Sequence, residues 1–545
     1  MKFSSLKKIE KCCTVALVCM LVVSIALISV WWLSYKDGDS EPNKEVTIQS
    51  TKTENTTLAS KLDFMPDKYS INESLPNLSF VKQNGDKLTL ESMRGKIVVL
   101  SFWASWCPYC KKELGLASET ATMLAEYPEV EYLLVDKLDN SKETKEQALL
   151  YLQDNNIPFT TVFDENLEVY NQLGLKVVPT TLIIDKQGVL KAWDAGGELN
   201  PDILKAKIDY VIDGGSYGVR NFITQELTNE HGGVRTNYMQ EKDTSLKSTD
   251  VLSESQGLIM EYAVGINDKA LFESSYKYVT NVMRKDPLTA WVVTENGASR
   301  VNSALDDLRM YRTMAAADAL WGGYYDKLDN YEKALRRYNT DNQCLVNEYD
   351  FKYKKKSEQL KLCFADFEAL ELLSEKSNQW AVVYQNSINT VENGYISDNF
   401  PLYYSQYDYS EKTYKNYDIN MAEGMVTLLN LAKIGRLKQT TIDWLKKAVE
   451  GEGIYAKYKT DGTIAPGYSF ESTAIYGLVS IIAQTVGDKT LANKALARME
   501  KMRIFDSNNK LNGAFGNRDG TGIYSFDQCI ALLAYNTTRE NDIQK

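Results

Sequence analysis

The stretch that decides the fold lies near the start of the chain, where residues 102–113 have the sequence FWASWCPYCKKE. The apolar residues 97–103 predict a buried strand, and the amphipathic residues 111–126 predict a helix. Cys107 and Cys110 therefore lie at the junction of a strand and a helix. Free N–H groups and the positive end of the helix dipole stabilise a thiolate there, so Cys107 is the predicted nucleophile and Cys110 the resolving thiol.

Two cysteines at this spacing can also form half of a zinc site. The sequence contains no second CxxC and one histidine, His231, in a glycine-rich turn, so we expect a redox pair and no metal. A single histidine also argues against a Ser-His-Asp triad, and no GxxxxGK[ST] phosphate loop is present. The net charge of -11 argues against a nucleic-acid partner.

Alternating strands and helices follow the cysteine pair. Residues 130–135 and 181–184 predict strands and residues 145–153 a helix, which together indicate an α/β fold with a partly parallel sheet. With residues 102–113, this pattern resembles the thioredoxin superfamily, specifically the membrane-anchored TlpA-like oxidoreductases, over about residues 71–213.

The resemblance implies thiol–disulfide oxidoreductase activity at Cys107 and Cys110 without a cofactor. Val178-Pro179-Thr180 matches the family's loop with a cis proline beside the redox pair, and Glu113 matches its acidic residue below the cysteines. Pro179 and Glu113 are therefore predicted to modulate the thiols. The expected partners are exported thiol proteins or a membrane redox partner.

An uncharged, apolar run occupies residues 12–35 and is long enough to cross a bilayer as a helix. Lysines dominate residues 1–11 and acidic residues follow the run, so we expect a cytoplasmic tail and a single-pass anchor in the cell membrane. The bulk of the chain would then be extracytoplasmic, behind a flexible linker over 36–70. The alternatives are a cleaved signal peptide and a lipoprotein modified at Cys19.

The second region, residues 215–545, is mainly helical. The predicted helical stretches are 253–283, 303–338, 366–391, 418–434, 440–449, 470–486, 488–501 and 524–535. About ten to twelve consecutive helices predict an all-α, (α/α)6-barrel-like domain, with a plain solenoid as the alternative.

A β-hairpin insert is predicted in this helical region. Residues 344–353 and 359–364 alternate around a turn at Lys354-Lys355-Lys356. Cys344 and Cys363 would face each other across it, and a structural disulfide between them is plausible in an oxidising compartment. Cys529 would then be an unpaired thiol.

Several carboxylates lie at the starts of predicted helices: Glu254, Asp306, Asp307 and Asp418. Singly, each is an ordinary helix-stabilising acid. Together their segments resemble the family-eight glycoside hydrolases. LSESQGLIM at 252–260 is similar to that family's SEGQG segment, DKALF at 268–272 and Trp291 also match, and residues 302–321 and Tyr417-Asp418 resemble its later acidic segments.

The resemblance implies inverting hydrolysis of a β-linked polysaccharide without a cofactor. Glu254 would be the general acid and Asp418 the base, with Glu423 as a fallback, and their carboxyl groups would lie roughly 6.5–9.5 Å apart. Asp306 or Asp307 would hold the sugar or the water, and Trp291 would stack on a sugar ring.

The sequence departs from the family at two points. Ser255 replaces a glycine, and the Asp-x-Asp pair is Leu305-Asp306-Asp307. The alternative is therefore a helical domain that binds glycan or docks client proteins without hydrolysis.

Overall fold

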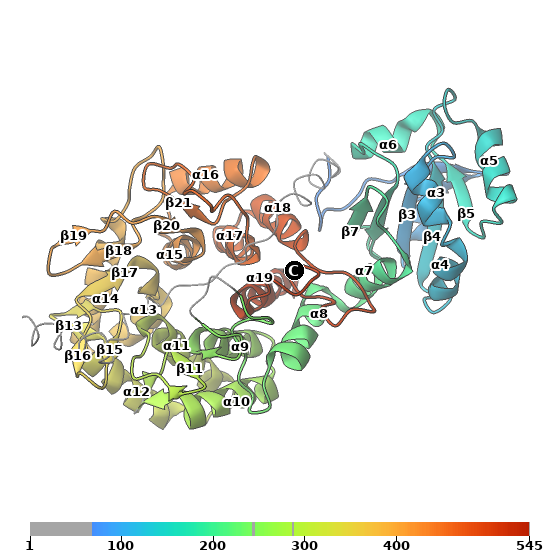
Figure 1. Ribbon diagram of the computed structural model, residues 1–545. Coiled ribbons are helices and arrows are strands. Elements are labelled where there is room, and N and C mark those ends of the chain that lie inside the picture. Colours follow the sequence, from blue (N-terminus) through green and yellow to red (C-terminus); the bar gives the residue numbers. More distant parts are fainter. Residues whose placement is uncertain (1–67, 242–245, 286–287, 544–545) are drawn as a thin grey trace, which may run out of the picture. The chain divides into compact units, whose positions relative to one another are not determined.

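The computed structural model describes residues 68–241, 246–285 and 288–543 (Figure 1). Of the chain's two units, Met1–Thr47 lies outside these residues, and Ile48–Lys545 holds every element described below. The predicted anchor at 12–35 and most of the predicted linker also lie outside them. Within the described ranges, no helix combines the length and apolarity needed to cross a membrane.

The first described part is an α/β domain around a seven-stranded sheet, in the order β2-β1-β5-β4-β3-β6-β7. β3 runs parallel to β4 and β4 parallel to β5, and the other neighbours are antiparallel. The predicted strands at 97–103, 130–135 and 181–184 are confirmed as β3, β4 and β6. The strands are β1 Ser79–Lys82, β2 Lys87–Thr89, β3 Ile97–Trp103, β4 Val130–Asp136, β5 Thr160–Phe163, β6 Thr180–Ile184 and β7 Leu190–Ala195.

Helices connect these strands: α3 Pro108–Leu114, α4 Ala117–Leu124, α5 Lys145–Asp154, α6 Glu168–Leu173 and α7 Pro201–Asp213. The single helix predicted over 111–126 is wrong. Gly115 ends α3, and Leu116, with φ −103° and ψ 17°, leaves helical geometry before α4 begins.

Alternate residues of β3 build two cores on opposite faces of the sheet, as the two-residue period of a strand requires. Val98, Leu100 and Phe102 pack in one core with residues of α6. Ile97 and Val99 pack in the other with residues of α4 and α7. All seven residues of β3 are buried, so this strand is the centre of the domain.

The second part consists of paired helices. Their bounds are α8 Gly215–Phe222, α9 Ser253–Gly265, α10 Lys269–Tyr278, α11 Ala304–Trp321, α12 Tyr325–Tyr338, α13 Phe367–Ser374, α14 Asn378–Glu392, α15 Met421–Lys433, α16 Gln439–Glu450, α17 Thr473–Thr485, α18 Lys489–Glu500 and α19 Ser525–Ile543. Each long helical stretch predicted from the sequence contains one or two of these helices.

Six of the helices form a closed inner ring (Figure 1). α9 packs against α11, and the series continues through α13, α15 and α17 to α19, which packs back against α9. Outer helices pack against this ring, for example α10 against α9, α12 against α11 and α18 against α17. This closed order is that of an α/α toroid, not of an open solenoid.

The predicted β-hairpin has different strand partners in the structure. β14 Cys344–Leu345 pairs with β13 Thr340–Asp341, and β17 Gln359–Lys361 pairs with β18 Gln406–Asp408. Only a short hairpin remains at the predicted turn, where β15 Tyr349–Asp350 pairs with β16 Lys355–Lys356. The sequence alternation was right, but the partner of β17 lies more than forty residues away in the chain.

The predicted disulfide between Cys344 and Cys363 is absent, because both residues are free thiols. Cys344 is half-buried in β14, while Cys363 is buried in the turn after β17, where its carbonyl accepts a hydrogen bond from Asn430 Nδ2 at 3.2 Å. Cys344 lies in the β13–β14 pair, and Cys363 follows β17, which pairs with β18. Because β14 and β17 do not pair with each other, the two cysteines do not face each other across a hairpin. Cys529 is also a free, buried thiol.

Candidate active sites

The redox pair lies at the N-terminus of α3. Cys107 caps the helix, and its Sγ accepts a hydrogen bond from the Cys110 N–H at 3.2 Å. The Cys107 thiol donates to the Val178 carbonyl at 3.4 Å, and the Val178–Pro179 peptide bond is cis, as predicted. Both cysteines are free thiols.

Glu113 lies below the pair and shares a small cavity of about 20 Å³ with Cys110 and Pro179. Burial, and then the charge of Asp194, raise the pKa of Glu113 to about 8. Burial also raises the pKa of the Cys110 thiol well above its ordinary value, and Cys107 raises it further. Cys110 therefore needs a proton acceptor before it can attack, and Glu113 is a group in its cavity that can exchange a proton near neutral pH.

Exposed aromatic rings flank the redox pair. Trp106 is 43% exposed and Tyr109 is 60% exposed, while Cys107 between them is buried. Lys142 lies over the Trp106 ring at 5.7 Å. A client disulfide that approaches Cys107 would therefore contact apolar rings first.

The helical part gathers carboxyl groups at the N-terminal ends of its inner helices. Because an outer helix separates each inner helix from the next along the chain, all six inner helices run in one direction and their N-termini meet at one end of the ring. Every one of these carboxyl-bearing residues is buried. They are Glu254 of α9, Asp306 of α11, Asp366 at the start of α13, Glu423 of α15, Glu471 just before α17 and Asp527 of α19.

Glu254 is distinct within this ring of carboxyl groups. Burial, and then the charge of Asp306, raise the pKa of Glu254 to about 8, and Arg309 offsets part of the rise. Glu423 and Asp527 add further negative charge. Among the described residues, none forms a hydrogen bond or an ion pair with the Glu254 carboxyl. With a pKa of about 8, this carboxyl is mostly protonated at neutral pH, and its O–H has no acceptor within the described residues.

The neighbouring carboxyl groups are held by cations or by backbone amides. Asp306 accepts hydrogen bonds from Ser253 Oγ at 2.6 Å and from Arg309 Nη1 at 3.0 Å. Glu423 pairs with Lys361 Nζ at 3.1 Å. Asp527 accepts from the backbone N–H of Ala474 at 2.7 Å, while Glu471 pairs with Arg498 at 2.6 Å.

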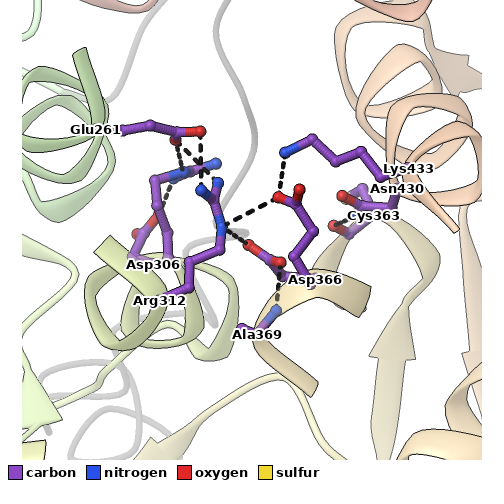
Figure 2. A network of polar contacts seen from close by, with 10 residues as sticks. Glu261, Asp306, Arg312, Cys363, Asp366, Ala369, Asn430 and Lys433 are labelled. Carbon is purple, nitrogen blue, oxygen red and sulfur yellow. Dashed lines mark hydrogen bonds and ion pairs between the residues drawn. The ribbon is translucent and has the colours of Figure 1, made fainter. Parts of the chain in front are cut away.

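An ionic network joins the inner helices next to this ring (Figure 2). Arg312 of α11 donates two hydrogen bonds to Glu261 of α9, both 2.9 Å long, and its Nε donates to Asp366 at 2.7 Å. Lys433 of α15 pairs with Glu368 at 2.5 Å. Although burial alone would raise them, the pKa values of Glu261 and Asp366 lie below the ordinary range because Arg312 and Lys433 stabilise the charged forms.

The structure separates the two adjacent aspartates of the predicted pair. Asp307 is fully buried, and its oxygens accept hydrogen bonds from Thr289 N–H at 2.9 Å, Asn302 Nδ2 at 2.7 Å and the Tyr331 hydroxyl at 2.5 Å. These partners occupy the carboxylate, so the predicted contact of Asp307 with sugar or water does not agree with the structure. Asp306 is the member of the pair that faces Glu254.

The side chain of Trp291 is 9% exposed, which leaves little ring surface for a sugar. Its backbone carbonyl instead accepts the Ser253 N–H at 3.0 Å, which fixes the residue before Glu254. The predicted stacking role therefore does not agree with the structure. Trp291 acts on the site through its main chain.

The two candidates for the base lie in different environments. Asp418 is exposed and directly precedes β20 Ile419–Asn420, next to Tyr417, which is 50% exposed. Glu423 is buried, close enough to Glu254 to act on its pKa. The structure therefore brings Glu423 to the acid and leaves Asp418 at the surface.

Sequence reasoning missed four members of the site: Asp366, Glu471, Asp527 and Arg309. Each acidic residue precedes or opens a predicted helix, as Glu254 does, and that position was the available signal. Within the residues that the structure describes, no group of three or more His, Cys, Asp and Glu side chains is placed to hold a metal ion.

Comparison with known proteins gives a family match for the first part of the described chain. Residues 71–193 match the AhpC/TSA family model, and this segment is a thioredoxin-like domain. The thiol-disulfide oxidoreductase ResA of Bacillus thuringiensis is 29% identical over 124 residues, 22% of this chain and 68% of ResA. The chain therefore contains a domain of the thiol–disulfide oxidoreductase type.

The rest of the chain has other relatives. The protein named "Putative lipoprotein YdaJ" of Bacillus subtilis is 26% identical over 330 residues, 59% of this chain and 87% of YdaJ. Among solved structures, an alpha-amylase from Clostridium perfringens covers 59% of this chain and 97% of its own, at 29% identity and a TM-score of 0.56. The helical part shares the fold of that protein.

Proposed function

We propose that the protein combines thiol–disulfide exchange at Cys107 and Cys110 with hydrolysis of a polysaccharide in the helical domain, residues 215–545. The first activity is supported by the thioredoxin-like segment and by the buried Cys107 thiol, which lies between the exposed rings of Trp106 and Tyr109. The uncommitted, protonated Glu254 supports the second, and it is the observation that carries the proposal.

In the redox reaction, the Cys107 thiolate attacks one sulfur of a client disulfide, and the other client sulfur leaves as a thiolate. Cys110 then gives its proton to Glu113 and attacks the Cys107 sulfur. A disulfide forms between Cys107 and Cys110, and the client's second thiol is released. The client gains two electrons, which a membrane redox partner would return to the pair.

In the hydrolysis, Glu254 donates its proton to the leaving glycosidic oxygen. A second carboxylate takes a proton from water, which attacks the anomeric carbon from the opposite face of the ring. Asp306, whose pKa burial raises while Arg309 at 3.0 Å offsets part of the rise, adds negative charge that raises the proton affinity of Glu254. Inversion requires a water molecule between the carboxyl groups of the acid and the base. This requirement favours a base that solvent and substrate can reach.

Two details of the proposed hydrolysis have alternatives: which carboxylate is the base, and which glycosidic linkage is cleaved. Asp418 is exposed to incoming substrate, whereas Glu423 is already engaged by Lys361 at 3.1 Å. We therefore keep Asp418 as the proposed base, with Glu423 as the alternative. The family-eight resemblance favours a β-linked glucan, while the solved relative is an alpha-amylase, so α-linked glucans belong in the same test.

The experiment is release of reducing ends by the purified full chain from β-1,4-glucan, mixed-linkage glucan, xylan, chitosan and starch. Cleavage should fall by at least about a thousandfold in Glu254→Gln, which keeps the shape but cannot donate the proton in the same way. Glu371→Gln, an exposed glutamate of α13, is the matched control and should retain full activity. Equal cleavage by Glu254→Gln and the control would exclude Glu254 as the acid.

A second candidate function is glycan binding or client docking without hydrolysis. The buried Trp291 ring and the fully occupied Asp307 favour it, because two residues expected to hold sugar are committed to the fold. Binding of a glycan without release of reducing ends would support this candidate, and absence of any glycan binding would favour docking.

We also propose that residues 12–35 anchor the protein in the cell membrane as a single span, with the remainder outside the cytoplasm. The uncharged length of this run and the lysines before it support the proposal. The anchored protein should stay with membranes after alkaline extraction, and proteolysis of intact protoplasts should digest residues 68–543. Incorporation of labelled palmitate at Cys19, with loss of the preceding residues, would support the lipoprotein alternative instead.

A further inference from the structure

Two buried carboxyl groups lie behind the redox pair and take no part in the exchange described above. Asp136 ends β4 and lies opposite Trp103 at the end of β3. Glu143 lies in the loop between β4 and α5. Both side chains are 0% exposed, although carboxyl groups are seldom fully buried without a cation.

Glu143 holds the turn that leads to Cys107. Its Oε1 accepts the Ser105 N–H at 2.9 Å, and its Oε2 accepts the Ser105 hydroxyl at 2.9 Å. The Glu143 N–H in turn donates to Asp139 Oδ1 at 3.0 Å, which fixes its loop. We call these two bonds from Ser105 to Glu143 the clamp. Because Ser105 is two residues before Cys107, the clamp fixes the position of the backbone that carries the exposed Trp106 and the nucleophile.

Asp136 has no hydrogen-bond donor of its own. Among the described residues, none donates to either of its carboxylate oxygens, and none forms an ion pair with it. The titratable groups that act on it most strongly are acidic, namely Glu143, which contacts it, then Asp139 and Asp164. Two buried carboxyl groups in contact, with no cation to neutralise them, avoid a large electrostatic cost only by keeping a proton between them.

We propose that Asp136 and Glu143 share one proton, and that this protonated pair holds Ser105 and the Cys107 turn in position for disulfide exchange. Asp136 is then a positioning residue, since it contacts neither Cys107 nor a client. The inference rests on the proposed redox function of the same site.

The pair makes the clamp dependent on pH. Burial, and then the charge of Glu143, raise the pKa of Asp136 to about 9. Below that pH, Asp136 donates to Glu143, and Glu143 accepts from Ser105. Above it, two adjacent buried carboxylates repel each other, and the bonds to Ser105 weaken. The reactivity of Cys107 then falls with rising pH, opposite to the usual increase of thiolate with pH.

The test compares the full chain with Asp136→Asn and Glu143→Ala by insulin reduction and by the alkylation rate of Cys107. The side-chain amide introduced by Asp136→Asn donates to Glu143 at every pH. This variant should therefore match the wild type near pH 7 and exceed it about fivefold near pH 10. Glu143→Ala should lose about tenfold near pH 7 and only about twofold near pH 10, where the bonds to Ser105 are already weakened in the wild type. Asp154→Asn, at the exposed end of α5, is the matched control and should follow the wild type.

An infrared difference spectrum tests the proton directly. Near neutral pH, Asp136→Asn should lose one carbonyl band of a protonated carboxylic acid that the control keeps. No lost band, or Asp136→Asn equal to the wild type at both pH values, overturns the inference. If the wild type does not reduce insulin, the proposed redox function fails, while the alkylation rates and the infrared band still decide the inference. If Glu143→Ala does not fold, Asp136→Asn alone decides it.

Discussion

The two candidate sites of this protein are assembled in opposite ways. The redox site draws on one strand-to-helix junction, residues 103–113, and on the loop before β6. The carboxyl ring draws on six helix starts between Glu254 and Asp527. A site built at one junction keeps its chemistry in a short motif. A site built from a closed ring has no such motif, and its ionisation states arise only when the helices pack. The following changes test this contrast, from the largest expected effect to the smallest.

Cys107→Ser should abolish disulfide reduction, by about a thousandfold or more, because serine is not ionised and cannot form the mixed disulfide. Insulin reduction measures this, and release of reducing ends by the same sample should not change. Cys344→Ser, which replaces a half-buried thiol elsewhere, is the control. A parallel loss of both activities would show that the two sites are not independent.

Arg312→Met should lower the free energy of unfolding of the helical domain by about 3–5 kcal/mol, because it removes the cation that pairs with the buried Asp366 and leaves the half-buried Glu261 with Arg309 Nε at 3.7 Å. Urea denaturation followed by circular dichroism measures the change. Lys333→Met breaks the exposed pair with Asp329, 59% and 58% exposed, and should cost less than about 1 kcal/mol. Similar costs for both variants would mean that the network contributes little beyond a surface pair.

Hydrolysis should depend on the proton of Glu254. Since burial and Asp306 raise its pKa to about 8, the acid is half protonated near that pH, mostly protonated a unit below it, and increasingly ionised above it. The rate should therefore fall about tenfold for each pH unit above the pKa, roughly a hundredfold over two units. A pH–rate profile of kcat/KM measures this, and a rate that stays constant across this range would rule out Glu254 as the proton donor.

Glu113→Gln should slow the resolving attack of Cys110 about tenfold near pH 8, where about half of Glu113 is ionised and can accept the thiol proton, because glutamine cannot accept it. Rapid-quench trapping of the mixed disulfide separates this step from the attack by Cys107, which should be little affected. Glu119→Gln, an exposed glutamate of α4, is the matched control. Unchanged decay of the mixed disulfide in Glu113→Gln would assign the proton to another acceptor.

The pattern of apolar residues along the sequence predicted most helices and strands, but it did not predict which strands pair in the second region. The strands at 97–103 and 130–135 were placed to within one residue, because burial on both faces leaves a continuous apolar run. The hairpin around Lys354 was right only at its tip, where β15 pairs with β16, because alternation shows that a segment is extended and not which strand it pairs with. The disulfide between Cys344 and Cys363 depended on that pairing and failed with it.

The acidic residues of the helical domain show the same limit. Asp306 and Asp307 are neighbours in the sequence, yet successive residues of a helix point in different directions. One faces Glu254, and the other is enclosed by Thr289, Asn302 and Tyr331. Their sequence contexts differ by a shift of one position, so only packing separates a candidate functional acid from a structural one.

The sequence by itself determined the redox pair, the thioredoxin-like order of strands and helices, and the helical character of the second region, because each depends on near neighbours in the chain. The tertiary structure alone decided that α19 closes the ring on α9, that no described residue pairs with the Glu254 carboxyl, and that Asp136 meets Glu143. These features depend on distances and burial between segments far apart in the chain, and burial sets the charge of each carboxyl group.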